Sequence, residues 1–245
     1  MFDNNPFFLP FVKKEQLTHD CYTFFFQRNG TERPFVPGQY YEMKLTHNNM
    51  DERGDSRVFT ISSSPTDTEF ITITTRIIQS SFKLCLASLK PAEIVQFDGP
   101  WDDLNFDEKD TTPHVFLAGG IGVTPYHSIV KYCMEKKIKT PMTLFVSWKN
   151  KEEMIFDEIF RNANRHIDNF SYVPALTEEK GLDINNWDGE IGRIDENMIK
   201  KYVPSVLDAK YFFSGPPVFV STLKQMVKGM GVPYDKIITE EFEGY

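Results

Sequence analysis

The 245-residue chain contains few of the residues that build disulfide frameworks and metal centres. Its three cysteines, Cys21, Cys85 and Cys133, stand far apart and form no C-x-x-C pair. This pattern excludes a disulfide framework and an iron–sulfur or zinc site, so we expect three packing residues in a reducing cytoplasm. The five histidines show no i, i+4 pairing, and a metal site is therefore not expected.

The chain also lacks a long apolar run and an excess of positive charge. No stretch approaches the ~20 apolar residues of a membrane helix, and the first residues lack the basic and apolar regions of a secretory signal. The net charge of −8 argues against a protein that wraps nucleic acid or coats an anionic membrane. Hydrophobic residues make up 40% and charged residues 25%, which is ordinary for a soluble globular protein. We therefore expect a cytoplasmic protein with one large or two modest domains.

The first 110 residues have the pattern of short β-strands separated by turns. Aromatic and β-branched runs at residues 22–27, 40–45 and 70–78 predict strands. One helix is expected, at residues 81–89, where apolar residues recur at helical spacing. Many short strands at close spacing indicate an antiparallel β-barrel.

After residue 113 the pattern changes to strands that alternate with helices. The predicted strands are residues 115–118, 143–148, 171–176, 211–213 and 237–239. The predicted helices are one that follows the first strand and runs through residue 134, and those at residues 152–162, 196–202 and 218–230. Such alternation implies right-handed crossovers and a five-stranded parallel sheet. We therefore divide the chain into a barrel domain at residues 1–110 and an α/β domain at residues 111–245.

A glycine-rich turn lies between the first strand and the first helix of the α/β half. Residues 119–125, Gly-Gly-Ile-Gly-Val-Thr-Pro, let the backbone approach a ligand closely, and the helix that follows offers unpaired N–H groups to a phosphate. Pro125 suits the first helical turn, and open α/β sheets bind nucleotides at this position. The alternative is a tight turn without a ligand, because glycine-rich turns are common. The spacing is also not the G-x-G-x-x-G of the ordinary dinucleotide fingerprint.

In the barrel half, the sequence Arg57-Val58-Phe59-Thr60 belongs to a further predicted strand. Arg57 and Phe59 share one side of it, and Thr60 points the other way. An arginine can bind a pyrophosphate bidentately, and an aromatic ring can stack on a flat heterocycle. The alternative is a surface arginine next to a core phenylalanine.

Several pieces of this kind occur in order along nearly the whole chain. They are Pro37-Gly38-Gln39, Arg57-x-Phe59-Thr60, Ser80-Ser81-Phe82-Lys83, Gly99-Pro100, the glycine turn, Ser214-Gly215-Pro216-Pro217 and an aromatic carboxyl terminus. This succession, from about residue 10 to Tyr245, resembles the ferredoxin–NADP reductase superfamily of flavin and pyridine-nucleotide oxidoreductases. The resemblance implies a flavin-binding antiparallel barrel followed by a nucleotide-binding α/β domain.

The resemblance also assigns residues to FAD. Arg57 would hold the flavin pyrophosphate, Phe59 would stack on the isoalloxazine, and Thr60 would hydrogen-bond near the reactive ring nitrogen. The other residues that it implies for FAD are Val58, Thr74, Thr75, Arg76, Ser80 and Ser81.

For NADH or NADPH, the resemblance implies that the glycine turn takes the pyrophosphate and that Ser214, Gly215 and Pro216 border the nicotinamide. The turn residues concerned are Gly119, Gly120, Ile121, Gly122, Thr124 and Pro125. Glu243 and Tyr245 match a glutamate-x-tyrosine ending whose aromatic ring covers the flavin and yields to the nicotinamide; a frayed tail is the alternative. The expected catalytic residues are Thr60, Ser214, Glu243 and Tyr245.

The sequence departs from the family pattern in three ways. Ser214 stands where the family has a cysteine before Gly-Pro, which removes a thiol and predicts slower hydride transfer. Residues 99–106 lack the second glycine of the family's G-P-x-G-x-F loop, so the inter-domain loop and the adenine end of the cofactor are expected to differ. No cysteine-rich iron–sulfur segment is present, so we expect a reductase module alone.

The implied function is an enzyme that takes hydride from NAD(P)H onto bound FAD and passes electrons to a separate acceptor. A ferredoxin, a cytochrome or another redox domain is the expected partner. Two alternatives stay open, namely a free-flavin reductase, from which flavin leaves as a substrate, and a regulatory subunit that binds flavin or nucleotide without turnover. FMN is an alternative to FAD.

The choice between NADH and NADPH also stays open. A 2′-phosphate requires arginines or lysines past the second and third strands of the nucleotide domain. Lys149 and Lys151 meet that requirement, whereas Glu178 and Glu179 would repel a phosphate. Arg193 is a further candidate for this contact.

Overall fold

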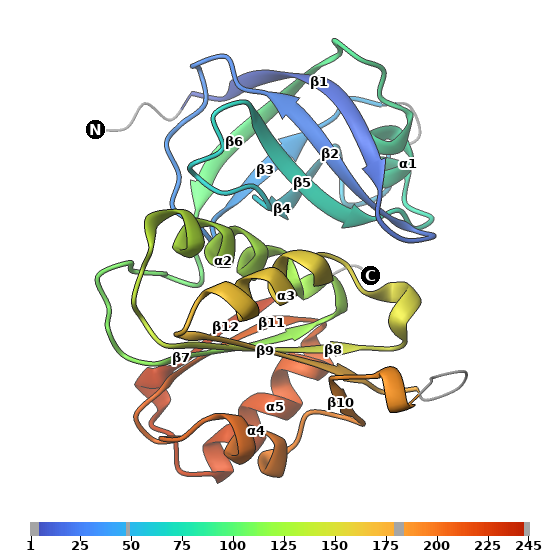
Figure 1. The fold of residues 1–245 in the computed structure, drawn as a ribbon. Coiled ribbons are helices and arrows are strands. Elements are labelled where there is room, and N and C mark those ends of the chain that lie inside the picture. The colour runs from blue at the N-terminus through green and yellow to red at the C-terminus, as the bar shows by residue number, and fades with distance from the viewer. Residues whose placement is uncertain (1–4, 48–49, 179–183, 243–245) are drawn as a thin grey trace.

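In the computed structural model, residues 5–47, 50–178 and 184–242 are described. Figure 1 shows a barrel-like amino-terminal half above an α/β carboxyl-terminal half, with helices α2 (Thr124–Lys136) and α3 (Asp157–His166) on the side of the sheet that faces the barrel. One apolar cluster fills the barrel, and two more cover the two faces of the α/β sheet. The two halves therefore each have a core.

The amino-terminal half is an antiparallel sheet that curls into a barrel-like shape. Its elements are β1 (Phe7–Gln16), β2 (Cys21–Gln27), β3 (Tyr40–Lys44), β4 (Ser56–Thr60), β5 (Phe70–Arg76), α1 (Ser81–Ser88) and β6 (Ile94–Trp101). The strands lie in the order β4-β3-β6-β1-β2-β5. In the described part of the chain, the edge strands β4 and β5 are joined by one isolated bridge, Ile61 to Ile73, so the barrel is not fully closed.

Aromatic side chains fill the inside of the barrel. Residues i and i+2 of a strand share one face, and this alternation places Phe24, Phe26, Tyr41 and Phe97 in the core with no exposed surface. The rings of Phe26 and Phe97 meet edge to face at 5.0 Å, an arrangement that adds to the free energy gained by burial.

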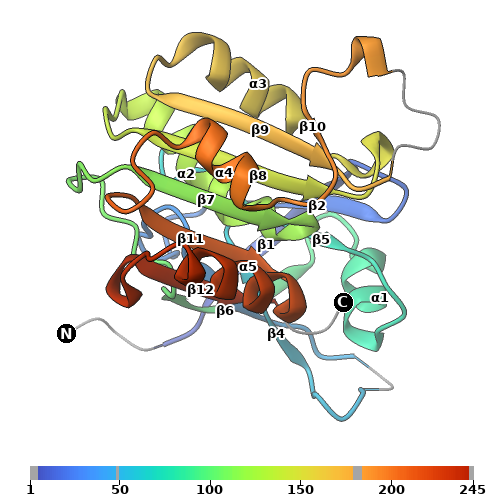
Figure 2. The same ribbon diagram turned by 90° about the horizontal axis from the view of Figure 1, so that it is seen from below.

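The carboxyl-terminal half is a parallel sheet with helices on both faces. Its strands are β7 (His114–Gly119), β8 (Met142–Trp148), β9 (Phe170–Leu176), β10 (Glu190–Ile191), β11 (Lys210–Gly215) and β12 (Ile237–Glu241). They lie in the order β10-β9-β8-β7-β11-β12. Helices α4 (Glu196–Tyr202) and α5 (Pro217–Gly229) cover the face away from the barrel (Figure 2). The 3₁₀ turns are η1 (Gly120–Val123), η2 (Lys151–Glu153), η3 (Ile184–Asn186) and η4 (Tyr234–Lys236).

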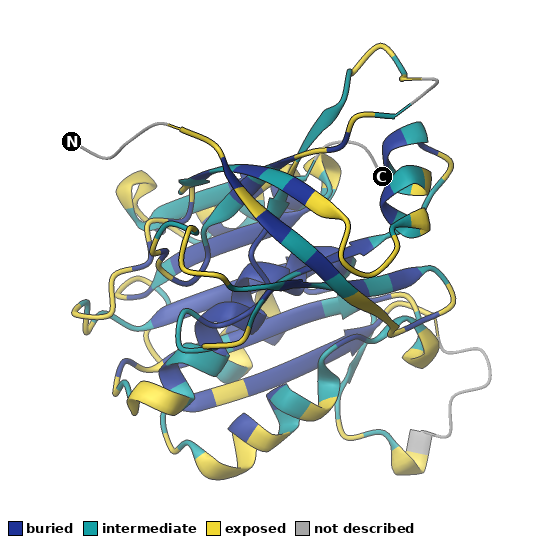
Figure 3. Ribbon diagram, turned by 90° about the horizontal axis from the view of Figure 1, so that it is seen from above, coloured by how far each residue is buried: buried dark blue, intermediate teal, exposed yellow. Residues whose placement is uncertain are grey.

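Burial follows these layers. Every residue of the central strand β7 is buried, as parallel strands covered on both faces require. Figure 3 shows the same contrast along the ribbon, with buried central strands and exposed residues on loops and on outer helix faces. In helix α2, the residues from Thr124 to Val130 are all buried, because the helix has the sheet on one side and the barrel on the other.

The predicted fold class is confirmed, with two local corrections. The parallel sheet has six strands, since the two-residue strand β10 pairs with β9. The helix predicted at residues 152–162 was wrong at its start, because Asn150 caps η2 and Phe156 then adopts a left-handed φ of 60° before α3 begins. The domain boundary stays a proposal, and we place it near residue 110, between β6 and β7.

The cysteines are unpaired. Cys21 and Cys133 are buried and Cys85 is partly buried. Burial raises the pKa of the Cys21 and Cys133 thiols to about 12, so neither is a thiolate near neutral pH. Among the described residues, no group of three or more histidine, cysteine or acidic side chains has the arrangement of a metal site.

Candidate functional site

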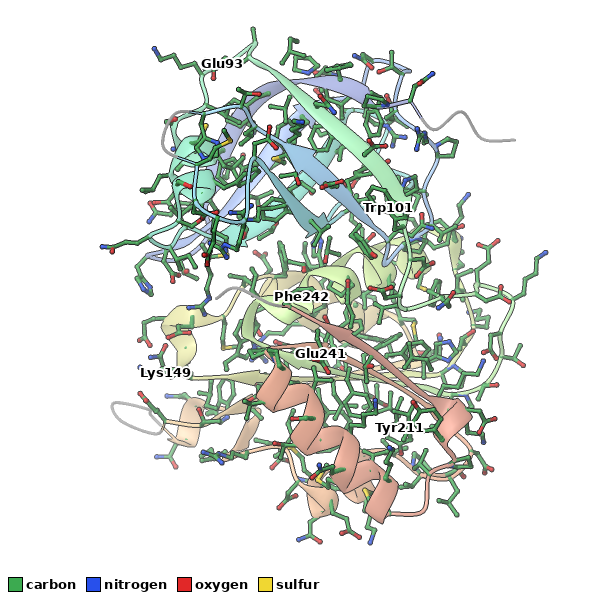
Figure 4. The ribbon with its side chains drawn as sticks, turned by 180° about the vertical axis from the view of Figure 1, so that it is seen from behind. Glu93, Trp101, Lys149, Tyr211, Glu241 and Phe242 are labelled. Atoms are coloured by element: carbon green, nitrogen blue, oxygen red, sulfur yellow. The ribbon has the colours of Figure 1, made fainter. Side chains whose placement is uncertain are left out.

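A cleft of about 300 Å³ lies where the barrel meets the carboxyl ends of the parallel strands. The barrel contributes β4, the end of β5 and the start of α1, and the α/β half contributes η1, α2 and the end of β12. Figure 4 shows Glu241 and Phe242 at the end of β12 that faces the barrel. The residues predicted from the sequence that line this cleft are Arg57, Val58, Phe59, Thr60, Thr74, Thr75, Ser80, Ile121 and Thr124.

One part of the cleft is basic. Arg57 donates to the carboxylate of Asp51 at 2.7 Å and to three backbone carbonyls, among them Ser56 O at 2.6 Å. Arg53 and Arg57 together lower the pKa of Asp51 to about 2. Burial, with the Arg53 charge nearby, lowers the pKa of Lys83 to about 8. Three cations thus line the cleft, and their charges favour an anionic ligand.

Helix α1 begins beside these cations. Its N-cap is Ser80, whose hydroxyl accepts from the Lys83 N–H, and the hydroxyl of Ser81 accepts from the Asp51 N–H at 3.3 Å. A helix amino terminus presents free N–H groups and the positive end of the helix dipole. Ser80 lines the cleft as predicted, whereas Ser81 instead supports the neighbouring loop.

Phe59 of strand β4 packs against the apolar core of the barrel. Its ring lies 5.9 Å from that of Phe82, over which the Arg57 guanidinium also sits at 5.3 Å. Arg57 and Phe59 therefore share one side of β4, as the alternation predicts. Val58 is 62% exposed, and Thr60 is buried directly opposite Tyr40 in the β3–β4 ladder.

A buried carboxyl group, Glu240, was missed by the sequence prediction. It lies opposite Ser214 in the β11–β12 ladder, and the Ser214 hydroxyl donates to Glu240 Oε2 at 3.3 Å. Burial is the main cause that raises the pKa of Glu240 to about 8, and the charges of Asp103 and Asp102 add to it. The group lines the cleft and is mostly protonated at pH 7.

Glu240→Gln should remove a pH dependence of stability. Between about pH 4.5 and 8 the unfolded chain loses the Glu240 proton while the folded chain keeps it, so the free energy of unfolding falls as pH rises. The slope is about 1.4 kcal/mol per pH unit. We expect the thermal midpoint of the wild-type protein without added cofactor to fall from pH 5 to pH 8 relative to that of E240Q. Parallel curves for the two proteins would show that Glu240 does not hold its proton.

The glycine turn packs against the end of β11. A Cβ added to Gly122 would lie 2.3 Å from Ser214 O and 2.6 Å from Gly215 Cα. Pro125 stands in the first turn of α2 as predicted. The structure thereby brings together the two predicted nucleotide segments, residues 119–125 and 214–216.

Gly122→Ala tests this close approach. Because the atoms in contact are backbone, they cannot move aside cheaply, and we expect a loss of stability of about 3 kcal/mol or more together with weaker nucleotide binding. Gly229→Ala is the matched control, since a Cβ there meets nothing within 4 Å and alanine favours a helix by about 0.5–1 kcal/mol. Chemical denaturation compares both variants with the wild type; equal stability of G122A and G229A would contradict the packing argument.

Some predicted residues do not line the cleft. Arg76 forms ion pairs with Glu153 at 2.6 Å and with Asp20 at 3.2 Å, and so connects the barrel to η2. Glu243 and Tyr245 lie outside the described residues. The remaining predicted residues that support or adjoin the cleft without lining it are Ser81, Gly119, Gly120, Gly122, Pro125, Ser214, Gly215 and Pro216.

None of the described helices is long and apolar enough to cross a membrane. The charged candidates for a 2′-phosphate are partly engaged, because Lys149 lies 3.6 Å from Glu178 and Lys151 sits over the ring of Trp187. Glu179 lies outside the described residues, and Arg193 is exposed.

Comparison with known proteins agrees with this architecture. Residues 116–225 match the oxidoreductase NAD-binding domain family. Over 237 residues, the chain is 27% identical to the glycine betaine monooxygenase reductase subunit of Pseudomonas aeruginosa, covering 94% of this chain and 63% of that protein. Over 162 residues it is 31% identical to a subunit of the Na⁺-translocating NADH-quinone reductase of Mannheimia succiniciproducens, covering 64% and 39%. The chain thus spans less than two thirds of the length of either relative.

Solved structures share the whole fold. A ferredoxin–NADP⁺ reductase from Neisseria gonorrhoeae with bound FAD and NADP has a TM-score of 0.79 at 18% identity, covering 96% of this chain and 98% of that one. The FAD/NAD-binding domain of nitric oxide dioxygenase from Vibrio cholerae has a TM-score of 0.81 at 18% identity, with the same coverage of both chains. Residues 116–225 therefore match an oxidoreductase NAD-binding domain, and the chain as a whole shares the two-domain fold of these solved structures.

Proposed function

We propose that this protein is a reductase that binds FAD in the cleft, accepts hydride from NADH or NADPH, and passes electrons to a separate acceptor. The observation that carries the proposal is the polarity of the cleft. Arg53, Arg57 and Lys83 supply positive charge from the barrel side, and the protonated Glu240 lies at the end of β12. A dinucleotide with an anionic middle and a flat neutral ring matches this arrangement.

The basic part of the cleft fits a diphosphate. Burial and the neighbouring Arg53 charge lower the pKa of Lys83, so a bound anion would relieve the repulsion between these cations and favour the charged form of the lysine. Arg57 can bind phosphate oxygens bidentately, and the first turn of α1 supplies N–H donors. We propose that Arg57, Ser80 and Lys83 hold the FAD diphosphate.

The other part of the cleft fits the ring. Tyr40, Phe59 and Phe242 supply aromatic surface, and Thr60 supplies a hydroxyl. When bound, the flavin would supply an acceptor for the hydride of the dihydronicotinamide.

The role that we propose for Glu240 and Ser214 concerns protons. The Glu240 carboxyl holds a proton at neutral pH, and the Ser214 hydroxyl orients that carboxyl through Oε2. A neutral carboxyl group can donate a hydrogen bond where a carboxylate cannot. In this proposal the acidic catalytic residue is Glu240, whereas the sequence analysis named Glu243.

The nucleotide donor would bind at residues 119–125, where the end of β7 leads into η1 and α2. This turn reaches the cleft through Ile121 and Thr124. The relatives named as reductase components of larger systems support a separate electron acceptor. The free-flavin reductase alternative differs in one measurable property, since its flavin leaves the protein.

Anaerobic mixing of the flavin-loaded protein with NADH and with NADPH tests the function. We expect the flavin to stay with the protein through gel filtration and its absorbance to bleach with at least one donor. Loss of the flavin on the column would favour the free-flavin reductase. Retention without bleaching by either donor would contradict a reductase and favour a regulatory subunit.

Arg57→Ala tests the proposed diphosphate contact. Loss of charge-assisted hydrogen bonds costs about 1.5–3 kcal/mol, so we expect FAD to bind about 10- to 100-fold more weakly in a fluorescence titration. Arg28→Ala is the control, because Arg28 is a similarly buried barrel arginine paired with Glu32 at 2.8 Å but does not line the cleft. If R28A and R57A weakened FAD binding equally, the proposed contact would be wrong.

A further inference from the structure

Helix α2 links the glycine turn of the α/β half to the barrel segment that follows β4. It begins directly after η1, at the glycine turn, and its first half runs beneath the barrel. The barrel segment that it contacts is residues 62–67, which we call the serine loop and which follows Thr60 and Ile61 at the end of β4. Ser62, Ser63 and Ser64 are buried between the two halves.

His127 makes the first contact between helix and loop. Its Nδ1 lies 2.6 Å from Ser62 O, and since a carbonyl can only accept, Nδ1 carries the proton. The imidazole stacks on Phe156 at 3.8 Å, and its buried Nε2 has no hydrogen-bond partner in the described part of the chain. Burial lowers the pKa of His127 to about 4, so the ring is neutral and keeps one tautomer across physiological pH.

Ser128 makes the second contact. Its hydroxyl, with no exposed surface, donates to Ser63 O at 2.6 Å. Further along the same helix, Lys131 forms an ion pair with Asp67, and Glu135 accepts from the Thr66 hydroxyl. The helix therefore contacts most of the length of the serine loop.

The loop is tied to the cleft on its other side. The Ser62 hydroxyl lies 2.9 Å from the hydroxyls of Thr72 and Thr74, and Thr74 lines the cleft. The Ser62 N–H donates to Thr72 O at 2.9 Å. A displacement of α2 would therefore be transmitted through the serine loop to β4 and β5.

We propose that His127 and Ser128 are positioning residues that fix the glycine turn relative to β4, and so set the approach of the nicotinamide to the flavin ring. This inference rests on the proposed function. Neither side chain lines the cleft, so each acts through a backbone carbonyl of the serine loop. Hydride transfer needs reacting atoms within about 3–3.5 Å, and a displacement of about 1 Å can cost a factor of 100 in rate.

The test measures flavin reduction under anaerobic conditions in three variants. Ser128→Ala removes the hydroxyl, Ser128→Thr keeps it, and His127→Phe keeps the ring that stacks on Phe156 but removes the N–H donor. Thr140→Val is the control, because the buried Thr140 hydroxyl also donates to a carbonyl, Asp110 O at 2.6 Å in the segment between β6 and β7, and neither residue belongs to the serine loop.

We expect the limiting rate of flavin reduction to fall at least 10-fold in S128A and H127F, with unchanged FAD content and a dissociation constant for the nucleotide within about threefold of wild type. The rate should recover in S128T and stay at the wild-type value in T140V. If the Ser128 hydrogen bond served stability alone, S128A would lose thermal stability as T140V does. Its limiting rate of flavin reduction would then not fall while its nucleotide dissociation constant stayed the same.

Wild-type rates in both S128A and H127F would overturn the inference and leave the proposed function intact. A slower rate in T140V equal to that in S128A would overturn it as well, because loss of stability would then explain both. Absence of flavin reduction in the wild-type protein with either nucleotide would overturn the proposed function and this inference with it.

Discussion

The candidate site depends on the burial of helix α2 between two sheets. The helix packs on the parallel sheet through Tyr126, whose ring lies 4.8 Å from that of Phe116, and on the barrel through Ile129, which lies against Gly38. A Cβ at Gly38 would lie 3.3 Å from the Ile129 side chain, and the φ of +94° there also favours glycine. This contact places the Pro37-Gly38-Gln39 turn of the barrel over the helix that begins at the nucleotide turn, and the cleft lies beside it.

The cleft beside this helix has positively charged and acidic residues on opposite sides. Cations from β4, α1 and the preceding loop lie on the barrel side, whereas Asp103, Glu240 and Glu241 come from the loop after β6 and from β12. This separation of positive and acidic groups orients a ligand that has an anionic middle and a neutral ring. A ligand bound in the reverse orientation would place its phosphates beside the carboxyl groups. The raised pKa of Glu240 and the lowered pKa of Lys83 are two consequences of the same burial.

Short sequence motifs predicted many of the residues that line this cleft. One residue that they did not predict, Glu240, is placed in the cleft by the register of two strands. Arg57, Thr60 and Ser80 were found because each stands within a short motif whose chemistry is local. Glu240 was missed because the end of the chain has three glutamates in four residues, and only the alignment of β12 with β11 places Glu240 opposite Ser214. The start of helix α3 was predicted several residues before its true start, because a phenylalanine gives no sequence indication that its backbone is left-handed, as it is at Phe156. The stacking of the Phe156 ring on His127 is a contact between distant parts of the chain, which residue order does not reveal. His127 itself was not singled out, since a lone histidine in a helix gives no indication of the loop that it contacts.

The most direct test of the account is an experimental structure of the protein with FAD bound. The account predicts diphosphate oxygens within hydrogen-bond distance of the Arg57 guanidinium and the first turn of α1, with the isoalloxazine beside Thr60 and Glu240. A diphosphate near Glu240, or a flavin bound outside this cleft, would contradict it.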